Sequence, residues 1–175
     1  GAKLDEEIIR NFDALGITIL NGYGITECAP LISANRNKYQ KPGSVGTPIL
    51  ACRIKIDNPD ENGEGEICVK GPNVMLGYYN NPEATAEILK GEWLLTGDMA
   101  KEDEDGFIYL VDRKKDVIIS GGENIYPVQI EDYLRANMKI KDVADIGLPD
   151  KRLGEITAAI IEIKEEGSAN EEENM

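Results

Sequence analysis

Residues 112–127 read DRKKDVIISGGENIYP, and this stretch decides how the chain is divided. Charged residues of both signs fill positions 112–116. A short β-branched run, 117–119, follows, and Gly121 and Gly122 then mark a turn. A charged segment next to a short strand and a flexible turn indicates a hinge beside a ligand site.

The residues on either side of this stretch differ in pattern. Between Lys41 and Asp112, short alternating runs are separated by turn signals, which predicts an antiparallel, barrel-like subdomain. A short helix interrupts it, with Asn81 as N-cap and Pro82 at the first helical position. Beyond Arg113 the pattern predicts a smaller α/β unit, with strand 117–120, helix 127–138 and strands 143–148 and 155–163. The fold class is therefore α/β (α+β).

The first residues predict a helix that leads to a strand and a polar loop. Apolar positions share one face from Leu4 to Leu15, and Gly16 should end the helix. We expect residues 17–20 to form a short buried strand. The segment 21–27, NGYGITE, should then emerge as a loop at the carboxyl end of that strand, where open α/β sheets place ligands.

Composition excludes several classes of function. The formal charge of −14 argues against nucleic acid as a partner, because such binding depends on cationic surface. Three scattered cysteines and the lack of histidine argue against a zinc site or a disulfide framework and exclude histidine-based triads. No apolar run of membrane-spanning length or signal peptide is found, so we expect a cytoplasmic protein. The acidic residues 165–175 should be solvated, as where a longer chain was cut.

Two polar segments carry nucleotide chemistry. In the segment 21–27, Tyr23 offers an aromatic face, Thr26 a hydroxyl for phosphate, and Glu27 a hard oxygen ligand for Mg²⁺. It is not a P-loop, because the lysine of that motif is missing. Asp98 could accept hydrogen bonds from both ribose hydroxyls. Taken alone, the segment 21–27 is equally compatible with a glycine-containing turn and a solvated Glu27. An aspartate after a glycine, as at Asp98, is on its own usually a turn residue.

Together these segments resemble the adenylate-forming superfamily, which contains acyl- and aryl-CoA ligases, luciferases and peptide synthetase adenylation domains. The resemblance covers nearly the whole chain. The matching segments, in the order found in the family, are 1–2, 21–27, 43–46, 65–67 with Gly71, 77–78, 93–98, 112–131, 148–150 and 154–155. Residues 120–127, SGGENIYP, are similar to the version found in acyl- and aryl-CoA ligases, and 114–116, KKD, to that of medium- and long-chain fatty acyl-CoA ligases.

The resemblance implies a reaction in two halves that uses ATP, Mg²⁺ and CoA. A carboxylate attacks the α-phosphate of ATP to give an acyl-adenylate and pyrophosphate, and the CoA thiol then displaces AMP. The implied nucleotide-binding residues are Gly1, Ala2, Gly22, Tyr23, Gly24, Thr26, Asp98 and Arg113. Among these, Tyr23 stacks on adenine, Asp98 takes the ribose hydroxyls, and Arg113 reaches ribose or phosphate.

The resemblance also assigns the catalytic and CoA-binding residues. Thr26 contacts phosphate and Glu27 holds Mg²⁺, and both count as catalytic. Lys115 is the hinge on which a small lid pivots between two orientations. Gly121 and Gly122 lie where the pantetheine of CoA would approach.

The implied domains are residues 1–113, the end of a large adenylation domain with a distorted antiparallel β-barrel, and 114–175, the start of a truncated, mobile lid. The phosphate loop and the terminal catalytic lysine of the family are missing from these residues, so we expect an internal fragment without activity of its own. Alternatives are a nucleotide-binding module without catalysis, an adenylation domain that loads a carrier protein, and a purely structural fragment. Homodimerisation, peripheral membrane contact of a longer protein, and a fatty as opposed to an aryl substrate are left open.

Overall fold

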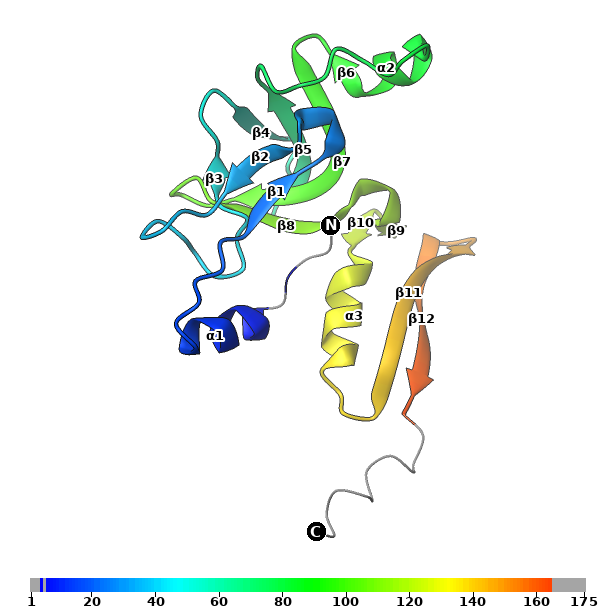
Figure 1. Ribbon diagram of the computed structural model, residues 1–175. Coiled ribbons are helices and arrows are strands. Elements are labelled where there is room, and N and C mark those ends of the chain that lie inside the picture. The colour runs from blue at the N-terminus through cyan, green and yellow to red at the C-terminus, as the bar shows by residue number, and fades with distance from the viewer. Residues whose placement is uncertain (1–3, 5, 165–175) are drawn as a thin grey trace. The chain divides into compact units, whose positions relative to one another are not determined.

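The computed structural model describes Leu4 and residues 6–164, which fall into two units (Figure 1). One unit ends at Val111 and the other begins at Asp112. The assignment of residues 1–113 and 114–175 to two domains of an enzyme stays a prediction. Among the described residues, no helix combines the length and the apolar composition needed to cross a membrane.

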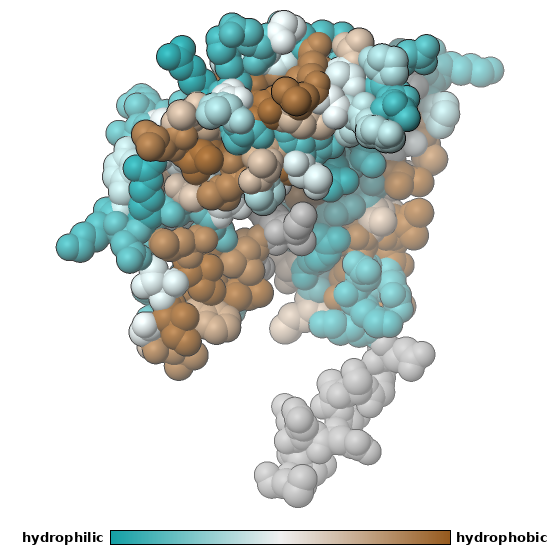
Figure 2. All heavy atoms as spheres, turned by 45° about the horizontal axis from the view of Figure 1, so that its top comes forward, coloured by the Kyte–Doolittle hydropathy of each residue, from teal (hydrophilic) through white to brown (hydrophobic). Residues whose placement is uncertain are grey.

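The first unit begins with helix α1 (Glu6–Ala14), which ends as predicted at Gly16. Gly16 has a φ of 78°, and the backbone N–H of Ile17 donates to the carbonyl of Phe12 at 3.0 Å, a bond typical of a Schellman motif. Apolar side chains of α1 and the segment after it lie on the surface (Figure 2): Ile8, Phe12, Leu15, Ile17 and Leu20. The apolar face of the helix was predicted, but the described residues leave it exposed.

The predicted strand at residues 17–20 was wrong. This segment has no strand structure, and Ile17 and Leu20 are 51% and 43% exposed. A β-strand is stabilised by hydrogen bonds to a neighbouring strand, and the described residues pair none with this segment. The β-branched sequence alone does not supply that partner.

Two antiparallel sheets form most of the rest of the unit, and the last strand of the larger sheet continues two residues past Val111. The smaller sheet has the order β1-β2-β3, from β1 (Gly22–Gly24), β2 (Leu31–Ala34) and β3 (Thr47–Pro48). The larger has the order β4-β5-β7-β6 with β8 paired to β7, from β4 (Arg53–Asp57), β5 (Gly65–Lys70), β6 (Leu89–Lys90), β7 (Trp93–Glu102) and β8 (Ile108–Arg113). This curled antiparallel architecture confirms the predicted barrel-like subdomain.

One apolar core joins the two sheets. Its buried members come from both: Tyr23, Cys28, Ile32, Cys52, Ile67, Val69, Leu94, Ala100 and Ile108. Burial of each large apolar side chain contributes about 1.5–3 kcal/mol. Backbone bonds add a second link, since Val45 N donates to Ile108 O at 2.8 Å and Ile108 N to Gly46 O at 3.0 Å. The position of β1 against the larger sheet is therefore fixed by packing.

The loop expected at residues 21–27 is instead ordered secondary structure. Gly22–Gly24 forms β1, paired with β2, and Thr26–Cys28 forms a short 3₁₀ helix, η1. A Cβ on Gly24 would lie 2.1 Å from the carbonyl oxygen of Pro30, so glycine is required here by the neighbouring backbone. The strand forms because the two glycines let β2 approach closely.

Helix α2 (Pro82–Ile88) begins as predicted. The Asn81 side chain accepts a hydrogen bond from Ala84 N at 3.1 Å, and Pro82 occupies the first turn. The Thr85 hydroxyl of this helix accepts from Tyr78 N at 2.9 Å, which ties the preceding segment to α2.

The second unit is a four-stranded sheet with a helix. It contains η2 (Lys114–Asp116), β9 (Ile118–Ser120), β10 (Glu123–Ile125), α3 (Pro127–Arg135), β11 (Ile140–Asp150) and β12 (Gly154–Ile163). The sheet order is β10-β9-β12-β11, and all pairs are antiparallel. This confirms the predicted smaller α/β unit, although α3 ends three residues before the predicted Met138.

Two glycines with positive φ allow backbone strain to be separated from steric overlap. Gly63 has a φ of 76° and open space where a Cβ would lie, whereas a Cβ on Gly46, with a φ of 81°, would lie 1.9 Å from the carbonyl carbon of Ala34. Gly63→Ala should cost about 1 kcal/mol of stability from the φ angle alone. Gly46→Ala should cost roughly 3 kcal/mol or more, because β2 must also move. Urea unfolding of both variants measures this difference, and equal losses would contradict it.

Candidate functional site

Asp98 lies on an irregularity in the middle of β7. Leu95 pairs with Cys68 of β5, and the next pair is Met99 with Glu66. Residues 96–98 of β7 therefore face the single residue Ile67, which makes a bulge. Gly97, at the centre of the bulge, has a φ of 75°, which favours glycine.

The bulge brings Asp98 to Tyr23 of β1. The Tyr23 hydroxyl donates to Asp98 Oδ2 at 2.5 Å, although the two residues are 75 positions apart. Tyr23 is 7% exposed, and Asp98 is half-buried. Burial, and then the hydrogen bond to Asp98, raises the pKa of Tyr23 well above its ordinary value. The phenol therefore keeps its proton at neutral pH and acts as a hydrogen-bond donor. The structure thus brings together two of the predicted site residues.

Glu27 has a hydrogen-bond partner that the sequence analysis did not assign. The Tyr78 hydroxyl donates to Glu27 Oε1 at 2.7 Å, and this bond raises the pKa of Tyr78. The backbone is held as well, since Met75 N donates to Glu27 O at 2.8 Å. The Asn73 amide donates to the carbonyls of Cys28 and Leu31. Residues 73–78 therefore fix the η1 segment that carries the Glu27 carboxylate.

The other predicted residues of this segment face outward. Thr26 is exposed, in the first position of η1, and Gly22 and Gly24 are exposed on either side of the buried Tyr23. The strand thus turns Tyr23 inward and leaves its neighbours accessible to a ligand. The predicted residues Gly1 and Ala2 lie outside the described residues.

Lys115, the predicted hinge, belongs to the second unit, as does the predicted nucleotide-binding residue Arg113, which ends β8. Arg113 and Lys115 are exposed, and Lys115 is the middle residue of η2. Asp112 anchors this segment to α3, because its Oδ2 accepts from Val128 N at 3.2 Å in the first turn of the helix. Its Oδ1 accepts from Arg113 N at 2.7 Å. The segment is therefore short, solvent-exposed and tied at one end to a helix.

Gly121 and Gly122 form the two-residue turn between β9 and β10. Their φ angles are 62° and 92°, and Ser120 pairs with Glu123 across the turn. Two consecutive positive φ angles in a hairpin of this length require glycine or a similarly permissive residue. Gly121 N also donates to Leu153 O at 2.8 Å, which joins the turn to the start of β12. The predicted flexible Gly-Gly turn is thus an ordered hairpin tip.

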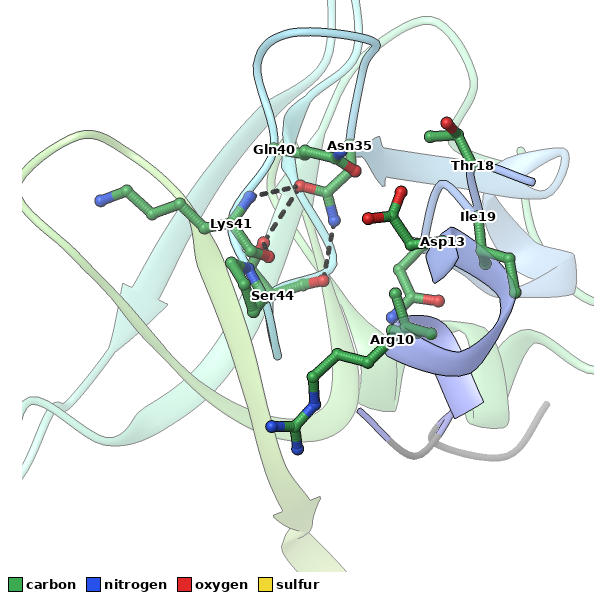
Figure 3. A pocket seen from close by; sticks show the side chains of 11 residues that line it. Arg10, Asp13, Thr18, Ile19, Asn35, Gln40, Lys41 and Ser44 are labelled. Atoms are coloured by element: carbon green, nitrogen blue, oxygen red, sulfur yellow. Dashed lines mark hydrogen bonds between the residues drawn. The ribbon is translucent and has the colours of Figure 1, made fainter. Parts of the chain in front are cut away.

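A cavity of about 430 Å³ between α1 and residues 35–44 is a separate feature (Figure 3). Both polar atoms of the Asn35 side chain, which lines this cavity, have hydrogen-bond partners: its Oδ1 accepts from Lys41 N and Ser44 Oγ, and its Nδ2 donates to Ser44 O. The Lys41 ammonium points away from it to Asp103 and Asp105. The lining contains Asn21 but neither Tyr23, Glu27 nor Asp98. This cavity is therefore not the candidate nucleotide site.

Two residues in the site were missed as functional residues, Tyr78 and Glu66. Both lie in segments that carry the family resemblance, but their partners, Glu27 and Gly97, are distant in the sequence. The buried position of a charged residue in an apolar strand was the signal at Glu66. No local pattern marks Tyr78.

Comparison with known proteins gives the same family throughout. The model of the family "AMP-binding enzyme" matches residues 1–79. The chain is 49% identical over 146 residues to a long-chain-fatty-acid–CoA ligase of Salmonella typhimurium, covering 80% of the chain and 26% of that protein. It is 42% identical over 168 residues to a feruloyl-CoA synthase of Amycolatopsis, covering 92% and 34%. The chain thus spans about a quarter to a third of the length of the curated relatives it matches.

Solved structures agree. The chain resembles o-succinylbenzoate CoA synthetase of Bacillus subtilis in complex with its acyl-adenylate intermediate, with a TM-score of 0.85 at 35% identity over 97% of the chain and 36% of that protein. The same enzyme in complex with ATP and magnesium gives a TM-score of 0.81 at 36% identity, over 92% and 35%. From the matching family, the relatives and the shared fold, the chain belongs to the adenylate-forming, AMP-binding enzymes.

Proposed function

We propose that this chain is part of an AMP-forming acid–thiol ligase, an acyl-CoA synthetase that activates a carboxylic acid with ATP and transfers the acyl group to CoA. The observation that carries the proposal is the 2.5 Å hydrogen bond between Tyr23 and Asp98, which joins two of the predicted nucleotide segments across two sheets. The names of the relatives, long-chain-fatty-acid–CoA ligase and feruloyl-CoA synthase, support the acid–thiol chemistry.

The reaction needs positioning more than proton transfer. In the first half, a carboxylate oxygen bonds to the α-phosphorus of ATP while the bond to the β-phosphate bridging oxygen breaks, releasing pyrophosphate. In the second, the CoA sulfur bonds to the acyl carbon, its proton is lost, and AMP leaves. A carboxylate is already a nucleophile at neutral pH, so a chain without histidine is suited to the first half.

Asp98 is proposed to accept hydrogen bonds from the ribose hydroxyls. The Tyr23 hydroxyl occupies its Oδ2 and fixes the orientation of the carboxylate before a ligand arrives. Stacking of adenine on Tyr23 stays a prediction. The hydrogen bond to Asp98 gives Tyr23 a second role, which is to orient that carboxylate. Gly22, Gly24 and Thr26 would line the nucleotide, since their outward faces are accessible.

Glu27 fits a magnesium ion that is bound mainly by substrate. Mg²⁺ keeps several waters and is commonly held by one or two carboxylates together with phosphate oxygens. Among the described residues, no group of three or more His, Cys, Asp or Glu side chains could hold a metal. A single half-buried carboxylate with one oxygen engaged by Tyr78 meets the smaller requirement. The ion would neutralise phosphate charge when bound.

The second unit is proposed to be the mobile lid. Lys115, exposed in η2, would be its pivot, and Arg113 would reach ribose or phosphate. Gly121 and Gly122 would face the pantetheine of CoA in the thioester-forming orientation. Their hairpin tip supports this role because it is exposed and has no side chains.

The finer assignments are also proposals. A fatty acid is the proposed substrate, and a cytoplasmic location, without a nucleic-acid partner, is the proposed setting. Contact of the whole protein with a membrane surface, and a homodimer, are compatible with this proposal. A nucleotide-binding module without catalysis is the second candidate, because the Tyr23–Asp98 and Tyr78–Glu27 contacts orient groups that are proposed to bind a nucleotide, whether or not a reaction follows. Loading of a carrier protein in place of CoA is the third.

The proposal is tested by nucleotide binding to this chain. Calorimetry should detect binding of AMP without metal and of ATP with Mg²⁺. Glu27→Gln should weaken the binding of Mg-ATP about tenfold or more, since one charged ligand is lost, and leave AMP binding unchanged. Glu83→Gln, on the exposed first turn of α2, is the matched control. The chain alone should release no pyrophosphate from ATP and fatty acid.

Each outcome separates the candidates. If AMP and Mg-ATP both fail to bind, neither the ligase nor the nucleotide-binding module describes these residues. Robust pyrophosphate release by the chain would overturn its expected inactivity. Formation of acyl-CoA by a longer protein that carries this chain would favour the ligase over the module.

The proton on Tyr23 gives a second test, at alkaline pH. Because the folded state raises the pKa of Tyr23, the unfolded state loses that proton first, from about pH 10, and stability should fall as the pH rises above this value. Tyr23→Phe should make this fall shallower. The control is Tyr79→Phe, in which the replaced ring is 93% exposed. Urea unfolding as a function of pH measures the slopes, and an unchanged slope in Tyr23→Phe would contradict the raised pKa that burial and the hydrogen bond to Asp98 give Tyr23.

A further inference from the structure

The backbone of the bulge that carries Asp98 needs hydrogen bonds other than those of a regular strand pair. Residues 96–98 face one residue of β5, so the regular ladder of hydrogen bonds is interrupted at this point. An interrupted ladder leaves backbone N–H groups that must find other partners. Two side chains supply these partners, one from each strand.

The first is Thr96, within the bulge itself. Its hydroxyl donates to Ile67 O at 3.0 Å and accepts from Asp98 N at 3.2 Å. It therefore bridges the two strands and fixes the backbone of Asp98. Thr96 is half-buried, so these bonds are partly protected from competition with water.

The second is Glu66, on β5. Its Oε1 accepts from Gly97 N at 3.0 Å, and the residue is only 7% exposed. A buried carboxylate carries a desolvation cost that an apolar side chain in this strand would not have. That cost is offset by hydrogen bonds to the charged oxygen, which are stronger than those between neutral groups. The carboxylate thus has a specific partner, the central N–H of the bulge.

We propose that Glu66 is a positioning residue for nucleotide binding: it holds the 96–98 bulge in the form that presents Asp98 to the ribose. The proposal rests on the proposed function of Asp98. Glu66 acts on the site indirectly, since it contacts Gly97 and Gly97 precedes Asp98. Glu66 would act through the geometry of the bulge and not by touching the nucleotide.

The chain offers a matched control in Glu64. Glu64 is 5% exposed and lies just before β5, but its Oε1 accepts from the Lys101 ammonium at 3.0 Å and not from the bulge. Glu66→Met removes the acceptor and keeps the length of the side chain. Glu66→Gln keeps an acceptor oxygen for Gly97 N and is the rescue variant. Thr96→Val tests the same bulge from the other strand if Glu66→Met does not fold.

The experiment has a nucleotide-free part and a nucleotide-bound part. Amide hydrogen exchange by NMR should show Gly97 N–H exchanging about tenfold or more faster in Glu66→Met than in the wild-type chain, with little change in Glu66→Gln or Glu64→Gln. AMP affinity by calorimetry should fall about tenfold in Glu66→Met and stay near wild type in Glu66→Gln and Glu64→Gln. Thr96→Val should resemble Glu66→Met in both.

Three results are decisive against the proposal. They are unchanged Gly97 exchange in Glu66→Met, faster exchange with full AMP affinity, or an equal loss of affinity in Glu64→Gln. A wild-type chain that binds no AMP would refute the proposed function, and Gly97 exchange would still decide whether Glu66 holds the bulge.

Discussion

The hydrogen bond from the Tyr23 hydroxyl to Asp98 is the contact on which the candidate site depends. It joins the smaller sheet to the larger one at the point where β7 is irregular. Hydrogen bonds to charged groups contribute about 1.5–3 kcal/mol, and burial of Tyr23 protects this one from water. Without it, the side-chain carboxylate of Asp98 would have no fixed orientation on the bulge. The shared apolar core around Tyr23 makes the contact possible, because it sets how closely β1 approaches β7.

The same kind of contact, a tyrosine hydroxyl that orients a carboxylate, occurs twice in the candidate site. A residue with a proposed role toward the ligand is held by a polar side chain from a neighbouring segment: Asp98 by Tyr23, and Glu27 by Tyr78. In each pair the tyrosine hydroxyl has a raised pKa, keeps its proton and donates a hydrogen bond to the carboxylate. Carboxylates oriented in this way can bind hydroxyl groups or a cation with a smaller loss of side-chain conformational entropy on binding. Such pre-organisation suits a reaction that depends on positioning.

The sequence predicted those features that are controlled by neighbours along the chain. The stop at Gly16 and the N-cap at Asn81 follow from backbone geometry at single residues, and both are confirmed. The strands of the two units follow from alternation and turn signals. The strand at 17–20 was wrong because the described residues supply no partner strand, which the local pattern cannot reveal.

The site was harder to predict than the fold. The glycines of 21–27 suggested a ligand loop, whereas Gly24 is required by the carbonyl of Pro30 in a strand pair. Asp98 was recognised as a candidate, but its bulge depends on the register of β5 against β7. The hydrogen-bond partners of Tyr78 and Glu66 cannot be read from the sequence for the same reason, since each partner is at least 31 positions away. Contacts across sheets are set by tertiary packing, which local patterns do not encode.

The most direct test is a double-mutant cycle between Asp98 and the ribose. Affinities of AMP and of its 2′,3′-dideoxy analogue are measured by calorimetry for the wild-type chain and for Asp98→Asn. The account predicts that the wild type prefers AMP by about tenfold or more and that Asp98→Asn loses most of this preference, because the carboxylate and the hydroxyls interact directly. An equal preference for AMP in both proteins would show that Asp98 does not contact the ribose, and the proposed site would be wrong.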